Sequence, residues 1–394
     1  MNAFRVNLTI ADLTAVLCSE KRRDLVFLHT AYAPYLSTNL QTVSSSKQIM
    51  VINIHESSKS FGHTKISKNH YNIYIHDIQE NFEQFNDLFR NAFTHFILRH
   101  NGVVLHGSSV VHNNHGYIFV GQEGSGKSTI RKLLSPLPSL GDDSAIIRFV
   151  HGETYLYGSP FYQKTQRLYP NKRVKIAGCF KLQKSPSNMI YLMTREEAIR
   201  LITGNAVIAK PTISEKTYVL NAAITFGTNI PCFSLWFSRH KAVRHIVFES
   251  SALHNTVIRT DLIAHIDRVI HLPDDVVWHQ AIATKMFLGT CRVICDTSWL
   301  FEFGNKVLIK DVAPEIKKKK FNSPHKYHIM DINKQSIASL FHYIPIAIVT
   351  DSSITLIDGN HHAVAQYIRA KLNTLFPLLV GISESQQFDS FVNV

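Results

Sequence analysis

The sequence predicts a mixed α/β protein with more than one domain, and three observations support this class. Short apolar runs with the period of β-strands alternate with stripes that have helical spacing. A glycine-rich loop, GQEGSGKS, occupies residues 121–128 between an expected strand and an expected helix. Near the C-terminus, ITLIDGNHH and AVAQYI form a second strand–turn–helix pattern. We therefore expect a phosphate-binding core followed by a smaller α+β domain.

The composition is that of a globular, basic protein. The chain has 394 residues, of which 45% are hydrophobic, and this suits two domains better than one. It carries 42 Lys and Arg against 29 Asp and Glu, a net charge of +13, which favours nucleotides, polyanions or acidic partners. The basic residues are spread along the chain. Their one dense cluster, KKKK at 317–320, is typical of a solvated linker.

Cysteine usage and hydropathy indicate a cytoplasmic protein without a membrane partner. The chain has five cysteines and no paired CxxC spacing, so buried free thiols in a reducing compartment are expected. No basic segment leads into an apolar stretch at the N-terminus, and no run reaches the roughly eighteen apolar residues of a membrane span. A homo-oligomer remains open.

The pattern divides the chain into four parts. Residues 1–84, with runs such as DLVFLHT, IMVINIH and YNIYIHD, predict a mainly antiparallel, strand-rich unit. Residues 85–250 contain the glycine-rich loop of residues 121–128, the P-loop, and form the P-loop domain. Residues 251–290 form a linker or partly helical connection, and residues 291–394 form the C-terminal α+β domain.

Around the P-loop, the expected elements are mostly strands. A helix with an apolar stripe is predicted over FEQFNDLFRNAFTHFILRH, with core positions Phe85, Leu88, Phe89, Phe93 and Phe96. VVLHGSSVV and YIFVG then form a hairpin that runs into the loop. Downstream strands are expected at TYLYGSPF, KIAGCFKLQ, NMIYLMT, PCFSLWFS and RHIVFES, with a helix that starts at Thr194.

The loop itself supplies the chemistry of phosphate binding. Its glycines let backbone N–H groups point at phosphate, while Lys127 reaches the β and γ phosphates and Ser128 contributes a hydroxyl to Mg²⁺. The expected nucleotide-binding residues are Gly121, Gly124, Ser125, Gly126, Lys127, Ser128 and Thr129.

Two aspartates follow the loop after one short helix. Asp142 comes only fifteen residues after Lys127, in the segment SLGDD, which can return beside the P-loop strand. Phosphoryl transfer to a hydroxyl needs a carboxylate that orients or deprotonates the acceptor and an oxygen ligand for the metal. Asp142 and Asp143 could divide these roles, with Asp142 on the metal. The alternative is a solvated turn or a helix cap.

This order of motifs resembles the HPr kinase/phosphorylase family and its kinase-like relatives, which share a core with ATP-type phosphoenolpyruvate carboxykinases. The resemblance rests on VLHGSSVV, YIFVGQEGSGKST, LGDD, GSPF and the later AGCFKLQKSPSNMIYLMTREEAIRLI, and covers about residues 85–250. It implies ATP and Mg²⁺ as cofactors, His106 as a residue beside the phosphates, and Asp142 with Asp143 as the base and metal group. On the residues alone, a hydrogen-bonded structural histidine is the favoured interpretation of His106.

The chain departs from that family at two points. Thr129 stands where HPr kinases carry Glu, and the glycine-containing signature that couples kinase to phosphorylase action is not found, so another acceptor than HPr is expected. Lys164 and Arg167, just after GSPF, are candidates to neutralise phosphoryl charge, or else ordinary surface cations.

The C-terminal pattern resembles the ParB/sulfiredoxin superfamily, whose strand, DGxHR turn and helix bind phosphate. This superfamily includes free serine kinases and DNA-partition proteins. The resemblance implies a second phosphate site at Asp358, Gly359, Asn360, His361 and His362. His362 replaces the usual Arg, which weakens phosphate binding at neutral pH. The alternative is a plain Asp-Gly turn between strand and helix.

The sequence thus favours an Mg²⁺-dependent kinase that transfers the γ-phosphoryl group of ATP to a hydroxyl. The acceptor would be a serine of a peptide or protein, or a small hydroxylated metabolite such as a free amino acid. The alternative is a nucleotide-gated regulatory protein with slow ATP hydrolysis that contacts DNA through its C-terminal domain. A weaker third interpretation is a motor-type ATPase that uses Glu249 as its hydrolytic acid.

Overall fold

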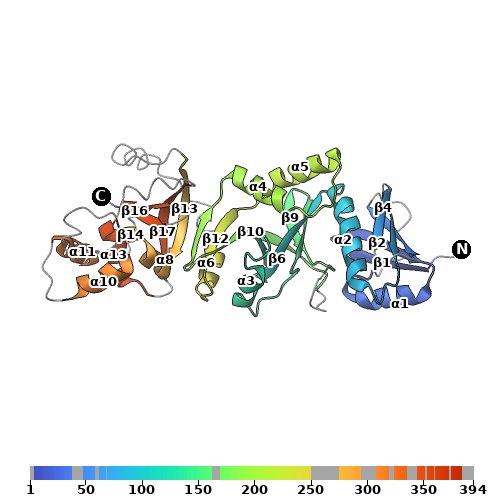
Figure 1. Ribbon diagram of the computed structural model, residues 1–394, viewed down its shortest axis with the longest axis horizontal. Coiled ribbons are helices and arrows are strands. Elements are labelled where there is room, and N and C mark those ends of the chain that lie inside the picture. Colours follow the sequence, from blue (N-terminus) through green and yellow to red (C-terminus); the bar gives the residue numbers. More distant parts are fainter. Residues whose placement is uncertain are drawn as a thin grey trace. The chain divides into compact units, whose positions relative to one another are not determined.

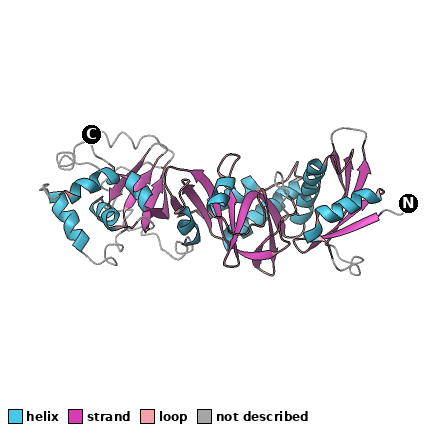
Figure 2. Cartoon of the chain, turned by 90° about the horizontal axis from the view of Figure 1, so that it is seen from below, coloured by secondary structure: helices cyan, strands magenta, loops and turns pink. Residues whose placement is uncertain are grey.

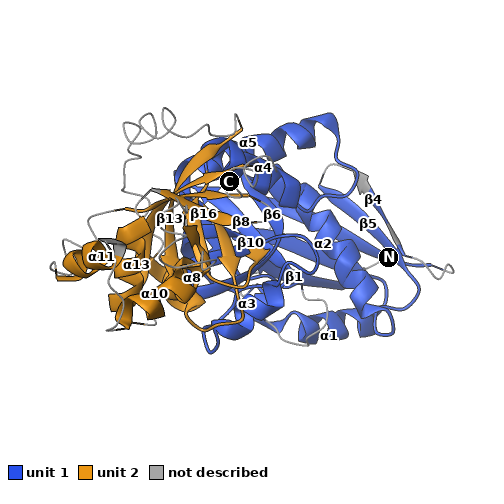
Figure 3. Ribbon diagram, turned by 60° about the vertical axis from the view of Figure 1, so that its left-hand side comes forward, with its two compact units in different colours: residues 1–182, 194–232 blue, residues 183–193, 233–394 orange. Residues whose placement is uncertain are grey.

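A computed structural model gives the fold of the chain (Figure 1). The residues that it describes are 4–37, 48–57, 62–67, 69–161, 169–249, 275–293, 308–318, 324–334, 344–350, 353–358, 360–371 and 374–383. Helices and strands alternate along the chain, which confirms the mixed α/β class (Figure 2). The chain divides into two compact units, residues 1–182 with 194–232 and residues 183–193 with 233–394 (Figure 3).

The N-terminal part of the first unit is a five-stranded sheet with the order β1-β2-β3-β5-β4. Its strands are β1 (Phe4–Ile10), β2 (Leu13–Ser19), β3 (Ile49–Glu56), β4 (His63–Ser67) and β5 (His70–Ile75). Pairing is antiparallel in β1–β2 and β4–β5 but parallel in β2–β3 and β3–β5. The expected mainly antiparallel unit is therefore wrong: this sheet is mixed.

The physical reason for the parallel pairing of β2 and β3 is a helix that the sequence pattern did not reveal. The run DLVFLHT, predicted as a strand, lies in α1 (Arg22–Ala31), which is followed by the short η1 (Ala33–Tyr35). Leu25 and Leu28 are buried at helical spacing, whereas Val26 between them is 62% exposed. A crossover of this kind is what allows β2 and β3 to run in the same direction.

The predicted helix before the P-loop is confirmed as α2 (Phe82–Leu98). Four phenylalanines of its stripe are fully buried, and Leu88 packs against the same core. Apolar residues of α1 and of alternate positions in the sheet belong to that core, so both helices cover one face of the N-terminal sheet.

A second sheet of the first unit carries the P-loop, and its strands follow the order β10-β7-β6-β8-β9. They are β6 (Gly102–His112), β7 (His115–Val120), β8 (Ser144–Val150), β9 (Glu153–Tyr157) and β10 (Arg173–Lys184). The predicted hairpin is β6–β7, and α3 (Lys127–Leu133) follows the loop. Because β9 also pairs with β10, this set of strands closes on itself.

The register of β6 decides where the functional residues lie. Its first half pairs with β8, with His106 opposite Ser144, and its second half pairs with β7, with Gly107 opposite Val120. The end of β7 and the start of β8 therefore meet at the middle of β6. The P-loop leaves from one of these points and the aspartates arrive at the other.

Two helices complete the first unit. The predicted helix that starts at Thr194 is confirmed as α4 (Arg195–Asn205), which begins with a capping box between Thr194 and Glu197. Helix α5 (Ile213–Asn229) was not predicted, although Thr212 and Glu215 form the same capping box. The spacing T-x-x-E was the signal that could have revealed it.

The second unit contains a sheet with the order β14-β16-β15-β17-β13-β11-β12. Its strands are β11 (Met189–Leu192), β12 (Cys232–Phe237), β13 (Val277–Thr284), β14 (Arg292–Val293), β15 (Ile346–Val349), β16 (Ile354–Asp358) and β17 (Leu375–Ile382). Its helices are α6 (Val243–Glu249), α8 (Lys285–Thr290), α10 (Ile309–Lys317), α11 (Pro324–Lys334) and α13 (Asn360–Arg369).

One element of the second unit differs from the prediction, and one agrees with it. RHIVFES was expected to be a strand, but its described residues, 244–249, lie in α6, where Val243, Ile246 and Val247 are buried at helical spacing. The strand and the helix of the predicted C-terminal pattern are confirmed as β16 and α13, and β15 pairs with β16. None of the helices in the described ranges is long and apolar enough to cross a membrane.

Candidate phosphate-binding site

The loop between β7 and α3 has the backbone of a phosphate cradle. Gly124 has φ of 79° and Gly126 has φ of 105°, a left-handed region in which glycine is favoured. A Cβ atom added to Gly124 would meet no atom within 4 Å, so the loop surface is open there. The chain then enters α3 directly, with Gly126 as its N-cap and Lys127 as its first residue.

The side chain of Lys127 lies folded over this loop. Its Nζ donates to the carbonyl oxygens of Gly121 at 2.7 Å and of Gln122 at 3.2 Å. Burial lowers the pKa of Lys127, and the negative charges of Asp143 and Glu123 oppose that shift. The interaction with Asp143 brings the loop lysine and the acidic pair into one electrostatic environment.

The segment before β8 delivers the two aspartates along the side of β6. Backbone N–H groups of Val111, Ser109 and Gly107 donate to the carbonyl oxygens of Pro138, Gly141 and Asp143, over 2.8, 2.9 and 3.3 Å. A Cβ atom on Gly141 would lie 2.5 Å from the carbonyl oxygen of Ser144, so this tight return requires glycine. The glycine of LGDD therefore has a steric cause.

Asp143 is held from two sides. Its Oδ1 lies 3.1 Å from Nδ1 of His106, and its Oδ2 accepts from Nη1 of Arg90 on α2 at 3.0 Å. The hydrogen bond with His106 is the main reason why the pKa of Asp143 is lowered, with further contributions from Arg90, while burial opposes the shift. Asp143 is thus an ionised carboxylate with a fixed orientation.

Asp142 has a different environment. Its Oδ2 forms an ion pair with Nη1 of Arg131 on α3, while its Oδ1 is buried and has no hydrogen-bond partner. Three serine hydroxyls around the loop and β6 are also buried without a hydrogen-bond partner: Ser108, Ser125 and Ser144. A buried carboxylate oxygen that lacks a donor suits a hard cation.

These residues fit a nucleotide with Mg²⁺. Mg²⁺ is usually held by one or two carboxylates together with phosphate oxygens and water, which matches Asp142 and the hydroxyl of Ser128 at the start of α3. In the described ranges, no group of three or more His, Cys, Asp or Glu residues could hold a metal ion by itself. The phosphates would have to complete such a site.

The structure brings most of the predicted site residues together. The expected nucleotide-binding residues form the loop and the first turn of α3, and His106 and Asp143 are in direct contact beside them. Lys164 and Arg167 lie outside the described residues. Sequence reasoning missed Arg90 and Arg131. Arg131 follows Lys127 by one helical turn, which is a usable signal, whereas no spacing relates Arg90 to Asp143.

The predicted second constellation belongs to the second unit. Asp358 ends β16, Asn360 begins α13, and Gly359 lies outside the described residues. The ring of His361 packs edge-on against His328 of α11, with centroids 4.7 Å apart. His361 and His362 are both partly buried in the first turn of the helix. The strand–helix junction therefore exists, and one of its histidines takes part in packing.

No family model matches this chain, and no curated protein matches it.

Proposed function

We propose that this protein is an Mg²⁺-dependent kinase that transfers the γ-phosphoryl group of ATP to a hydroxyl group. The observation that carries this proposal is the ionised carboxylate of Asp143, fixed by His106 and Arg90 and within electrostatic reach of Lys127. Phosphoryl transfer to a hydroxyl needs such an oriented carboxylate.

The two aspartates would then have separate roles. Asp143, with a lowered pKa, is a weak base, so it would mainly orient the acceptor hydroxyl and take its proton late in the transfer. This fits a loose transition state in which the acceptor oxygen is activated only slightly. Asp142, with its unpartnered buried oxygen, would hold the metal together with Ser128. Bound Mg²⁺ would neutralise charge on the phosphates.

Lys127 would change partner when the nucleotide binds. Its Nζ now donates to two loop carbonyls, Gly121 and Gln122, and these bonds would be replaced by bonds to phosphate oxygens. Positive charge from Lys127 and the loop N–H groups would stabilise the charge of the transferring group. His106 would keep Asp143 in place and contact the phosphates from the other side.

The arrangement supports the proposed kinship with HPr kinase-like enzymes. A hairpin leads into the loop, the acidic pair returns beside it, and further strands follow, which is the order on which the resemblance rests. The β15–β16–α13 unit likewise supports the proposal of a ParB/sulfiredoxin-like C-terminal domain. As acceptor we propose a serine of a peptide or protein, or a free hydroxylated metabolite.

The test is transfer of label from γ-labelled ATP in the presence of Mg²⁺ to a panel of peptides, proteins and hydroxy amino acids. Lys127→Ala and Asp143→Asn should each lower transfer by about a hundredfold or more, since each removes a preorganised charge from the site. Lys132→Ala, an exposed lysine on the same helix, is the matched control and should keep full activity. Unchanged transfer in both site variants would refute the proposal.

A further inference from the structure

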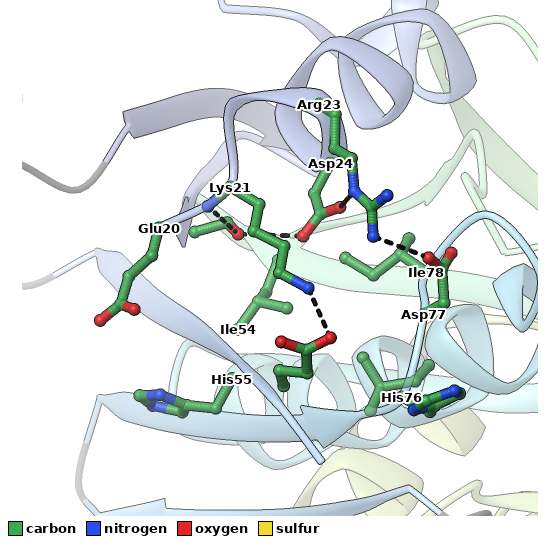
Figure 4. Close-up of a pocket in the computed structure, with 12 residues that line it drawn as sticks. Glu20, Lys21, Arg23, Asp24, Ile54, His55, His76, Asp77 and Ile78 are labelled. Atoms are coloured by element: carbon green, nitrogen blue, oxygen red, sulfur yellow. Dashed lines mark hydrogen bonds and ion pairs between the residues drawn. The ribbon is translucent and has the colours of Figure 1, made fainter. Parts of the chain in front are cut away.

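A polar pocket lies in the first unit, in residues that the phosphate-binding site does not use (Figure 4). Its volume is about 260 Å³, and its walls come from the segments that end β2, β3 and β5. These three strands are parallel to one another, so their carboxyl ends open on the same edge of the sheet. In α/β sheets, ligands characteristically bind outside the carboxyl ends of the strands.

Two ion pairs line this carboxyl-end pocket. Nζ of Lys21 lies 2.5 Å from Oε1 of Glu56, and Nη2 of Arg23 donates to Oδ2 of Asp77 at 2.9 Å (Figure 4). The side chains of Arg23 and Glu56 are 60% and 57% exposed. Ion pairs this exposed contribute little to stability, so a ligand can replace them at low cost.

A third carboxylate sets the direction of Arg23. Asp24 is buried, its Oδ2 accepts from the hydroxyl of Ser19 at 3.1 Å, and its Oδ1 lies 3.7 Å from Nε of Arg23. The guanidinium group therefore has a second carboxylate near its Nε, while its Nη2 points toward Asp77 and the pocket.

The balance of charge decides what kind of ligand suits the pocket. A simple anion would take Lys21 and Arg23 and leave Glu56 without its ion-pair partner, whereas Asp77 would keep the backbone N–H groups of Gln79 and Glu80. A simple cation would take Glu56 and Asp77 and leave Lys21 without its ion-pair partner, whereas Arg23 would keep Asp24. A molecule with one charge of each sign satisfies both sets, and its own net charge is zero. The cost of an unpaired charge therefore argues against ions of a single sign.

We propose that the carboxyl-end pocket binds a small zwitterion with an ammonium and a carboxylate group, as an α-amino acid has. The carboxylate lies between Lys21 and Arg23, and the ammonium lies between Glu56 and Asp77. The volume is just below the range of about 300–1,000 Å³ of drug-sized ligand pockets, which fits a ligand of this size. This site goes beyond the proposed kinase activity and does not depend on it.

Calorimetric titration of the full chain, without nucleotide, tests the proposal. The probes are the twenty common amino acids, with acetate, methylamine and inorganic phosphate as single-charge controls. At least one amino acid should bind with saturation and a stoichiometry of one, whereas acetate and methylamine at equal concentration should not. Absence of binding by all twenty amino acids would overturn the proposal, as would saturable binding of phosphate that depends on Lys21.

Two variants connect the binding with this pocket. Lys21→Gln and Glu56→Gln each remove one charged contact with the ligand. Each should lower the affinity for the amino acid by about tenfold or more, because hydrogen bonds to charged groups are stronger than those between neutral groups. Both side chains are exposed enough for the variants to fold. Lys175→Gln removes an equivalent exposed pair with Glu153 and should leave the affinity unchanged. Wild-type affinity in both pocket variants would show that the ligand binds elsewhere.

Discussion

At the scale of single residues, Arg90 is the group whose role only the structure reveals. It is on α2, 53 residues before Asp143, and donates to the same carboxylate that His106 contacts from the other side. We predict that Arg90→Gln raises the pKa of Asp143, because a positive charge near the carboxylate is lost. In pH–rate profiles of phosphoryl transfer, the acid limb should move to higher pH, with little change in the KM for ATP.

The matched control for Arg90 is Arg173→Gln, which breaks an exposed ion pair with Asp12 in the same unit and should leave the profile unchanged. A profile for Arg90→Gln with the wild-type acid limb would mean that Asp143 is not the titrating group. A purely structural role for Arg90 would lower the rate equally at every pH, so the position of the limb separates the two roles.

The same residues explain how much of the site the sequence could predict. The loop, its lysine and the adjacent aspartates form contiguous motifs whose chemistry is local, so a single chain segment is enough to identify them. Arg90 contacts Asp143 only because α2 packs against the N-terminal sheet and β6 follows it directly. That contact depends on tertiary packing, for which the residue spacing holds no signal.

At the scale of elements, the junction of α2 and α5 depends on one buried carboxylate. Glu215 caps α5 through the backbone and hydroxyl of Thr212. Its Oε1 is also 2.8 Å from Nδ1 of His95 and 3.3 Å from Nη2 of Arg99, both from the α2 region. Burial opposes ionisation, but the hydrogen bonds from Thr212 and His95 prevail and lower the pKa of Glu215 to about 2.

The pKa shift gives a prediction with a definite sign. Because the folded-state pKa is below the ordinary 4.5, ionised Glu215 contributes stability above about pH 4.5, and this contribution is lost as the pH falls toward 2. Glu215→Gln should therefore lower the free energy of unfolding at pH 7 by about 1–3 kcal/mol, and the difference from the wild type should shrink through that window. Urea titrations between pH 7 and pH 2.5 measure it.

Glu153→Gln is the control for the capping prediction, because it removes a carboxylate of an exposed pair and should cost at most about 1 kcal/mol. If the loss in Glu215→Gln is the same at pH 7 and at pH 2.5, the carboxylate charge does not stabilise the junction.

Elements that the sequence pattern misassigned share a physical cause. DLVFLHT and HIVFE are short apolar runs, and a short run fits a buried strand and a buried helix face almost equally well. The long stripe of α2 repeats often enough to exclude a strand, and the hairpin of β6 and β7 has a turn with two asparagines at positive φ. Predictability here follows the number of repeats and the presence of turn residues.

At the scale of the whole molecule, the two predicted phosphate sites belong to different units. The P-loop site lies entirely in the first unit, and the strand–helix junction before α13 lies in the second. A ligand stabilises the folded part to which it binds, by about 2.7 kcal/mol when its concentration is a hundred times its Kd. Nucleotide binding can therefore be located by the amides that it protects from hydrogen exchange.

We predict that ATP with Mg²⁺ at that concentration slows exchange about a hundredfold in the amides of β6, β7 and α3 that exchange only through unfolding of the first unit. Lys127→Ala should abolish this protection, whereas Lys132→Ala should retain it. Hydrogen-exchange mass spectrometry on the full chain reads both units in one experiment. Nucleotide-dependent protection that persists around α13 in Lys127→Ala would place ATP near His361 and His362 of the second unit. A histidine is only partly charged at neutral pH and lacks the guanidinium group of Arg, which argues against tight phosphate binding there.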